Sequence, residues 1–287
     1  MSVYQYNLNI LIGITGDVWF NTDNIDITNI NASTYGEKRD NYQRISNLPP
    51  IKKIVRVTNN SISMITRDNR YIHISSNISI APSITDAYMV NDSEMIYLTV
   101  DRKMMVSKNL LDPTESTSLA SDVTSIHPLK LKRSTRSNMG MSQYINYIFV
   151  RYLTYDVILG SYRSDGWSNY SRLIRTFIDN DRLIIKVYLD VILTESHILS
   201  LSIDVNDKPV VESFNISNAE DVIRYQSQIV ILTNKTLSTL SGTPLINGVE
   251  RLIKFIEYSP TQFYPVGVGD KIYDSRLQLV PIPMVLA

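Results

Sequence analysis

The sequence has 287 residues, of which 44% are hydrophobic and 20% are charged, and this composition excludes a disordered chain. Lys plus Arg and Asp plus Glu both number 28, so no overall charge favours nucleic acid or an anionic membrane as the main partner. Cysteine is absent, which excludes disulfides and cysteine-ligated metals and favours folding inside the cell. No segment is long and apolar enough to predict a membrane span, and residues 1–9 do not resemble a secretory signal.

An apolar strand that is closed by threonine and followed by a short polar turn recurs along the chain. Its six copies span residues 10–15, 62–66, 95–99, 150–154, 191–194 and 229–233. The turns that follow are rich in Asp, Asn and Gly, which tolerate tight-turn backbone conformations, so each copy predicts a hairpin. A seventh copy at 264–268 lacks the threonine.

The spacing of these copies predicts the fold class. From Thr15 to Val268 the mean spacing is about 42 residues, within the roughly 40 to 50 residues of a propeller blade. Apolar and β-branched runs precede most copies and predict strands covered on both faces, at 51–57, 87–90, 183–188, 222–225 and 252–256. No segment sustains a helical period, which disfavours an α/β fold. The sequence therefore predicts an all-β chain that forms a single β-propeller domain over residues 1–287, with about seven blades and six as the alternative.

Three stretches resemble the repeat of the RCC1-like propellers. Residues 47–55 are similar to the family's proline followed by an Ile-Lys-x-Ile strand, and residues 60–71 are similar to its Ser-x-x-Leu-Thr-x-Asp-Gly hairpin. Residues 16–19, Gly-Asp-Val-Trp, resemble its Asp-Gly-x-Val-Trp step. The resemblance implies the propeller architecture of that family. The family's Gly-x-x-His and Gly-Gln-Leu-Gly elements are absent, and no residue here matches its nucleotide-exchange activity on a small GTPase.

Two intervals between copies are longer than the others and predict loop insertions near 21–47 and 107–143. Long loops on a rigid scaffold often make contacts with partners, although a solvated loop is the competing interpretation. The candidate contacts in the first interval are Tyr35, Lys38, Arg39, Tyr42 and Arg44. Those in the second are the basic residues Lys130, Lys132, Arg133 and Arg136. A loop rich in Gly, Ser and Asn adds the aromatic residues Trp167 and Tyr170.

Catalytic and metal-binding motifs are not apparent in the sequence. The chain's three histidines lie in different repeats and lack the spacing of metal ligands: His73, His127 and His197. Aspartates follow equivalent strands at positions Asp17, Asp68, Asp101, Asp156 and Asp270. Their convergence at the mouth of a propeller channel would give a glycosidase-like site, whereas formation of tight turns is the simpler role.

These patterns favour a non-enzymatic propeller scaffold that mediates protein–protein interaction or assembly and uses no metal or cofactor. The abundance of Ile, Asn, Lys and Tyr is typical of an AT-rich coding sequence and favours a structural component of a virion or phage. The alternative is a hydrolase with carboxylates at the channel mouth. Other proteins are the expected partners, and binding of nucleic acid through residues 130–136 is a weaker hypothesis. The oligomeric state stays open.

Overall fold

A computed structural model describes residues 4–7, 10–13, 15–23, 30, 34–39, 41–58, 60–91, 93–113, 115–133, 144–153, 157–163, 166–169, 184–204, 206, 208–225, 228–233, 236–246, 252–259 and 262–267. All the elements in these ranges are β-strands, which confirms the all-β prediction. The chain divides into two compact units, Met1–Ser121 with Ile256–Ala287, and Asp122–Phe255. In the described residues, no helix is long and apolar enough to cross a membrane.

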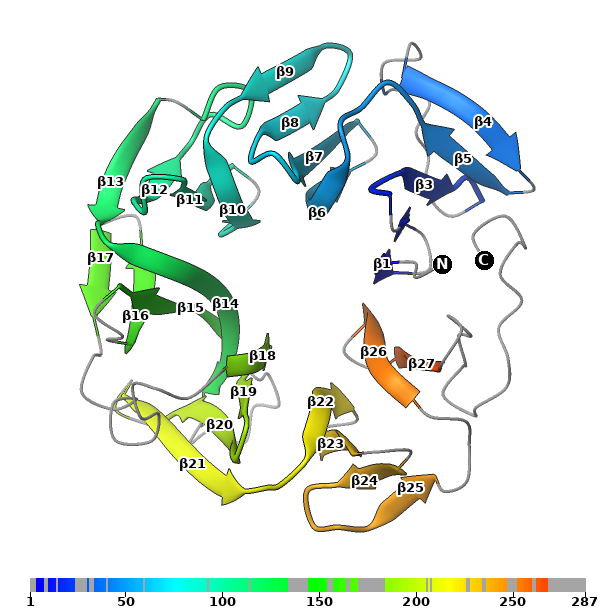
Figure 1. Cartoon of the computed structure of the whole chain (residues 1–287). Coiled ribbons are helices and arrows are strands. Elements are labelled where there is room, and N and C mark those ends of the chain that lie inside the picture. Colours follow the sequence, from blue (N-terminus) through cyan, green and yellow to red (C-terminus); the bar gives the residue numbers. More distant parts are fainter. Residues whose placement is uncertain are drawn as a thin grey trace, which may run out of the picture. The chain divides into compact units, whose positions relative to one another are not determined.

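The first unit contains three antiparallel sheets (Figure 1). The N-terminal sheet has the order β1-β2-β3-β5-β4, built from β1 (Tyr4–Asn7), β2 (Ile10–Ile12), β3 (Val18–Asn21), β4 (Tyr35–Arg39) and β5 (Tyr42–Ile45). The next sheet is a meander of β6 (Ile51–Thr58), β7 (Ser61–Thr66), β8 (Tyr71–Ile74) and β9 (Ile78–Ala81). A second meander contains β10 (Ile84–Met89), β11 (Met95–Thr99), β12 (Met104–Ser107) and β13 (Ser116–Ala120).

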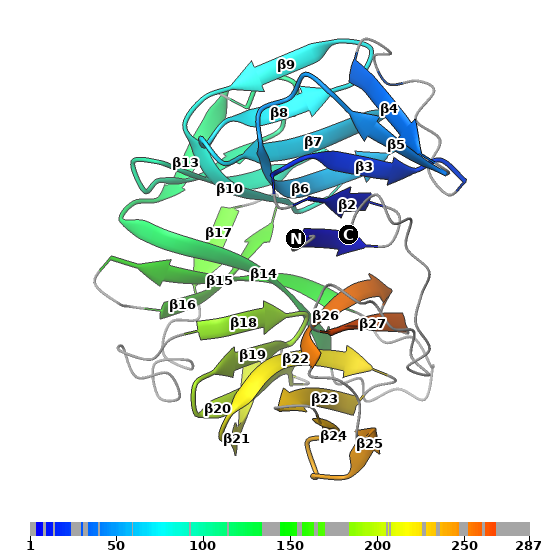
Figure 2. The same cartoon turned by 45° about the vertical axis from the view of Figure 1, so that its right-hand side comes forward.

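The second unit contains three further meanders (Figure 2). They consist of β14 (Val123–Arg133), β15 (Tyr144–Tyr152), β16 (Val157–Arg163) and β17 (Gly166–Asn169); of β18 (Ile184–Tyr188), β19 (Val191–Thr194), β20 (His197–Ile203) and β21 (Pro209–Asn215); and of β22 (Ala219–Tyr225), β23 (Gln228–Thr233), β24 (Thr236–Thr239) and β25 (Pro244–Ile246). The long strand β14 pairs in parallel with the end of β20, which joins the first two meanders into one eight-stranded sheet. A two-stranded sheet of β26 (Leu252–Ser259) and β27 (Gln262–Gly267) follows in the chain.

Successive meanders in the first unit pack face to face, because their strands bury both faces. On β7, Met64 packs in one cluster with Phe20 of β3, whereas its neighbour Ile65 packs in another with Ala87 and Met95 of the next meander. Adjacent residues of a strand point to opposite faces, so β7 is covered on both sides. The run 51–57, predicted to be covered on both faces, shows the same pattern in β6, where Ile54 packs in the first cluster and Val55 in the second. The prediction is thus confirmed for this strand.

The second unit repeats this packing. Leu129 of β14 shares a cluster with Ile192 of β19, and Val191 of β19 shares another with Val222 of β22. All four side chains are at most 1% exposed. At about 25 cal/mol per Å² of apolar surface removed from water, these contacts between sheets are a major source of stability.

In the meanders β6–β9 and β10–β13, the turn between the second and third strands has the predicted hairpin form. Thr66 donates its N–H to the carbonyl of Arg70 at 2.9 Å, and its Oγ1 accepts the N–H of Arg70 at 2.9 Å. The corresponding bonds between Thr99 and Lys103 are both 3.0 Å long. Threonine recurs at the end of this strand because its hydroxyl satisfies a backbone donor that the turn would otherwise leave unpaired.

In the first copy, the strand was predicted to close at Thr15, but the residue that closes it is Gly13, two positions earlier. Gly13 occupies the place of the threonine, since its N–H donates to the carbonyl of Asp17 at 2.8 Å. Gly16, with φ of 91°, takes the left-handed position that Asn69 holds at 62° in the second copy. Thr15 instead donates from Oγ1 to Asp17 Oδ2 at 2.7 Å.

A repeated backbone bond links each turn to the next meander in the first unit. The carbonyl of Gly16 accepts the N–H of Ile51, the first residue of β6, at 2.9 Å. The carbonyl of Asn69 accepts the N–H of Ile84, the first residue of β10, also at 2.9 Å. The left-handed residue of each turn therefore sets the position at which the following sheet begins.

The predicted loop insertions need a correction, because part of each is regular strand. Residues 21–47 contain β4 and β5, and residues 107–143 contain β13 and β14. In β14, Leu129 and Leu131 are buried while Lys130 and Lys132 are exposed, which is the period-two pattern of a half-covered strand. Lysines alternating with leucines, interpreted as a basic loop, here belong to a strand.

Candidate functional site

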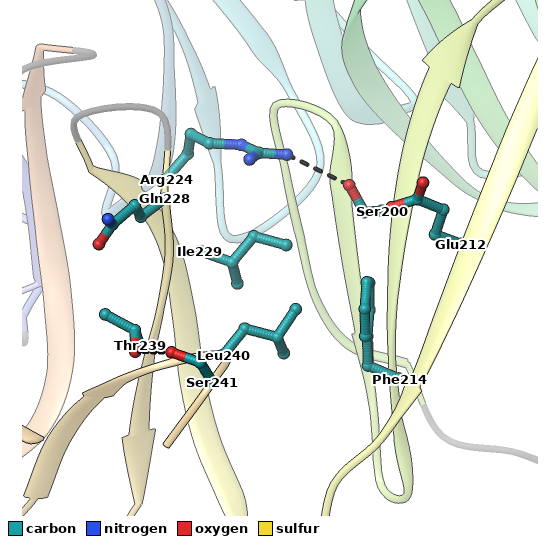
Figure 3. Close-up of a pocket in the computed structure, with 9 residues that line it drawn as sticks. All are labelled: Ser200, Glu212, Phe214, Arg224, Gln228, Ile229, Thr239, Leu240 and Ser241. Atoms are coloured by element: carbon teal, nitrogen blue, oxygen red, sulfur yellow. Dashed lines mark hydrogen bonds between the residues drawn. The ribbon is translucent and has the colours of Figure 1, made fainter. Parts of the chain in front are cut away.

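A cleft of about 490 Å³ lies between the β18–β21 meander and the β22–β25 meander (Figure 3). One wall comes from β20 and β21, and the other comes from β22, β23 and the turn that follows β24. Both meanders belong to the second unit. Its lining combines apolar side chains with polar and charged ones.

The base of the cleft is apolar. Ile229 of β23 is buried in the cluster shared by the two meanders, and Leu240 packs against that cluster while staying partly exposed. The N–H of Leu240 donates to the carbonyl of Ile229 at 3.1 Å, which holds the turn over the strand. Phe214 of β21 contributes a half-exposed ring from the opposite wall. A side chain entering here would exchange water for three apolar surfaces.

Arg224 crosses the cleft from β22 toward the other meander. Its Nε donates to Asp190 Oδ1 at 3.0 Å, its Nη2 lies 2.5 Å from Asp190 Oδ2, and the same Nη2 donates to Ser200 Oγ at 3.2 Å. The side chains of Arg224 and Asp190 are 22% and 15% exposed. A two-point guanidinium–carboxylate contact fixes orientation as well as distance, so it holds the two walls together and leaves the arginine neutralised.

Glu212 gives the cleft its uncompensated charge. It lies on β21 directly opposite Ser200 in the ladder, and its side chain is exposed. Among the residues that the structure describes, none forms a hydrogen bond or ion pair with the carboxylate of Glu212. Since Asp190, which lies outside the lining, already balances Arg224, the carboxylate of Glu212 is the one charge of the lining that has no counter-charge among the described residues. Gln228, Thr239 and Ser241 add neutral hydrogen-bonding groups at the rim.

The lining of the cleft includes one carboxylate, that of Glu212. Its single free carboxylate has no second carboxylate in the lining with which to share acid and base roles. In the part of the chain that the structure describes, no group of three or more His, Asp or Glu side chains could hold a metal ion.

The candidate contacts of the first interval all lie on one hairpin of the first unit, and none of them lines the cleft. Tyr35, Lys38 and Arg39 belong to β4, and Tyr42 and Arg44 belong to β5. Lys38 is exposed and Tyr42 is buried. The Nη2 of Arg44 lies 2.6 Å from an oxygen of Asp17, so this cation is already paired.

The basic and aromatic candidates do not join the cleft either. Lys130 and Lys132 share the exposed face of β14, and the backbone of Arg133 pairs with Ile203 of β20. Trp167 belongs to β17. Two further candidates, Arg136 and Tyr170, lie outside the described residues.

The described turn aspartates, Asp17, Asp68 and Asp101, are each engaged by a nearby cation and a threonine hydroxyl. Asp68 accepts from Thr66 Oγ1 and pairs with Arg70 at 2.5 Å, and these two partners, Arg70 foremost, hold its pKa below 3.8. Asp101 has the same surroundings and a lowered pKa. For Asp17, burial raises the pKa but its hydrogen-bonding partners outweigh burial and lower it overall. A carboxylate held ionised in this way is a poor general acid.

The two other aspartates of that set, Asp156 and Asp270, lie outside the described residues. The proposed convergence of all five at a channel mouth therefore stays a prediction.

His73 belongs to a buried polar cluster on β7 and β8. Its Nδ1 lies 2.8 Å from Ser63 Oγ, which also accepts the hydroxyl of Tyr71 at 3.0 Å. Ser63 is 1% exposed and His73 is 6% exposed, so no substrate reaches this serine. Burial, followed by the positive charge of Arg56, lowers the pKa of His73. The cluster therefore stabilises the sheet.

The remaining histidines also have local structural partners. His127 packs its ring against Phe149 at a centroid distance of 6.0 Å, and His197 Nδ1 lies 2.8 Å from Ser196 Oγ.

Sequence reasoning did not identify the residues of the cleft because they lie in ordinary strands without a motif. One signal was present: Arg224 is the lone charge within the apolar run 222–225. A charged side chain in a strand that is covered on both faces needs a partner, so the position of Arg224 indicated a polar contact in this part of the fold.

No family model matches this sequence, and no curated protein matches it either. The resemblance to RCC1-like repeats therefore stays a prediction. Solved structures with a similar chain trace include YCF48 bound to D1 peptide, at 10% identity and a TM-score of 0.47, covering 89% of this chain and 84% of that one. Apo AztD from Citrobacter koseri has 8% identity and a TM-score of 0.47, covering 95% and 84%. The β-propeller domain of Cps50 (Swd1) from Myceliophteria thermophila has 11% identity and a TM-score of 0.41, covering 92% and 79%.

The class of the protein follows from its own sheets. Consecutive four-stranded antiparallel meanders that pack face to face are the building plan of a β-propeller, and this chain is an all-β protein of that class. Five sheets of four or more strands occur within the described residues. The count of seven blades stays a prediction.

Proposed function

We propose that this chain is a non-enzymatic propeller scaffold that binds an extended segment of a partner protein in the cleft between the β18–β21 and β22–β25 meanders. The observation that supports this function is an open cleft with an apolar base and a polar rim, held rigid by the Arg224–Asp190 contact. Rigid walls reduce the entropy lost on binding, because the site needs no ordering of its own.

We further propose seven blades. Sheet β1–β5 and the meanders that begin at β6, β10, β14, β18 and β22 would supply six, and β26 with β27 would begin the seventh. The join between β14 and β20 unites two of these blades in one sheet. A scaffold of this kind suits assembly into a larger structure, and a virion or phage particle is the setting that we propose from composition.

A hydrolase is the weaker alternative. The described turn aspartates are paired with a nearby cation and a threonine hydroxyl, and their lowered pKa values keep them ionised. Retaining and inverting glycosidases both require one carboxyl group that holds a proton near neutral pH.

The test is selection of peptides on the intact protein. A random dodecapeptide phage library is panned on the wild type, and enriched peptides are measured by fluorescence polarisation against Leu240→Asp and, as a matched control, Leu111→Asp. Leu111 is 54% exposed and lies outside the cleft. We expect Leu240→Asp to weaken binding by at least about tenfold, which corresponds to about 1.4 kcal/mol, and Leu111→Asp to leave it unchanged.

Circular dichroism and thermal unfolding first establish that both variants fold. Failure to enrich any peptide, or enriched peptides that bind Leu240→Asp as tightly as the wild type, would contradict the proposed function.

A further inference from the structure

Resting on the proposed function, we propose that the partner segment carries a lysine or arginine separated by one residue from an apolar side chain. Glu212 receives the cation, and the surface of Phe214 and Leu240 receives the apolar group.

The charge of the cleft selects a cation. Arg224 makes two contacts with Asp190 and a third with Ser200, so its guanidinium is already occupied. Glu212 is exposed and has no partner among the residues that the structure describes. A carboxylate on the partner would meet the like charge of Glu212, whereas an ammonium or guanidinium group would pair with it.

The spacing of the recognised pair follows from strand geometry. Glu212 and Phe214 lie two residues apart on β21, and both side chains line the cleft (Figure 3). Residues two apart on a strand share one face and are separated by about 6.5 to 7 Å. An extended partner segment has the same period, so a cation and an apolar side chain on alternate residues reach both groups together.

Phe214 contributes to both halves of this pair. Its ring borders the apolar base formed by Ile229 and Leu240. The aliphatic stem of a lysine or arginine can pack along an aromatic ring while its charged end stays near water at Glu212. An acidic or purely apolar segment uses only part of this surface.

Three synthetic nine-residue peptides test the inference. They are identical except for a central Lys-Ser-Leu, Glu-Ser-Leu or Lys-Leu-Ser, so they vary the charge and the spacing separately. Dissociation constants are measured by fluorescence polarisation at low and at moderate salt for the wild type, Glu212→Gln, Glu212→Lys and the control Glu195→Gln. Glu195 is an exposed glutamate in the turn between β19 and β20.

We expect the Lys-Ser-Leu peptide to bind more tightly than the other two and to weaken as salt is added. Glu212→Gln is expected to weaken it about two- to fivefold, as for a partly exposed ion pair. Glu212→Lys is expected to reverse the order of the lysine and glutamate peptides, and Glu195→Gln to change nothing.

Equal binding of the lysine and glutamate peptides, or an unchanged order in Glu212→Lys, overturns the inference. If these peptides nevertheless lose affinity for Leu240→Asp, the cleft still binds a segment and the proposed function stands. Binding of none of the three peptides also overturns the inference, whereas peptides selected by panning decide the proposed function on their own.

Discussion

Gly16 offers the sharpest test of how the sheets of the first unit are joined. Its φ of 91° lies in the left-handed region. A Cβ at this position would lie 2.6 Å from the backbone nitrogen of Ile51 and 2.7 Å from Cα of Pro50. These are backbone atoms at the start of β6, so they cannot rotate aside as a flexible side chain would. Gly16→Ala therefore strains its own backbone and pushes β6 away.

The cost can be worked out against an internal control. Gly242 has φ of 81° in a turn with the same hydrogen bonds, but a Cβ there would meet nothing within 4 Å. Gly242→Ala is thus expected to cost only the left-handed strain, about 1 kcal/mol. Gly16→Ala adds about 1 to 3 kcal/mol of overpacking and about 1 kcal/mol for the bond from Ile51 to its carbonyl. The expected total is about 3 to 5 kcal/mol.

Urea denaturation followed by circular dichroism measures both variants, and hydrogen exchange by mass spectrometry reports the segment that contains Ile51. We expect Gly16→Ala to lose at least twice as much unfolding free energy as Gly242→Ala and to speed exchange at the start of β6. Equal losses in the two variants, with unchanged exchange at Ile51, would refute the close contact.

Three further predictions concern single residues. Burial lowers the pKa of His73 below its ordinary value of 6.5, so the unfolded state binds the proton first as the pH falls; unfolding free energy should fall below about pH 6.5 in urea titrations, and less so in His73→Gln. Asp221 accepts from Lys186 at 2.5 Å and is largely buried, so Asp221→Asn should lower the urea-derived stability by about 1 to 3 kcal/mol, whereas no loss would mean that the pair contributes nothing. Arg102 has φ of 63°, so Arg102→Gly should raise stability by about 0.5 kcal/mol in the same assay, and a decrease would count against strain there.

The strands were predictable because their covered faces leave a direct trace in the sequence. The runs at 51–57 and 222–225 became β6 and β22, since β-branched residues suit strands that are buried on both sides. The placement of the first turn was not predictable. Thr15 precedes Gly16 and Asp17, a string that imitates a threonine-closed strand, and only the bond from Gly13 to Asp17 reveals the true register.

Apart from the charge of Arg224, the cleft was not predictable from the sequence, for a different reason. Glu212 and Leu240 come from different meanders, and nothing in the linear order states that β21 and the turn after β24 face each other. The functional prediction was based on the two longest intervals between copies of the repeat. It therefore selected residues that lie on the β4–β5 hairpin and on β14. The candidate site described above instead lies where two regular repeats meet.

The two meanders that form the cleft are joined by a second ion pair besides that of Arg224 with Asp190, and a similar pair occurs in the other unit. Lys186 of β18 pairs with Asp221 of β22 at 2.5 Å, and Lys53 of β6 pairs with Asp86 of β10 at 2.6 Å in the other unit. Each aspartate sits at an irregularity of its strand, where its carboxylate also accepts the N–H of the next residue at 2.8 Å. The irregularity and the ion pair thus hold the first strand of one meander beside the first strand of the next, β18 beside β22 and β6 beside β10. Because Glu212 takes no part in these contacts, exchanging its charge should alter what binds in the cleft without shifting the walls.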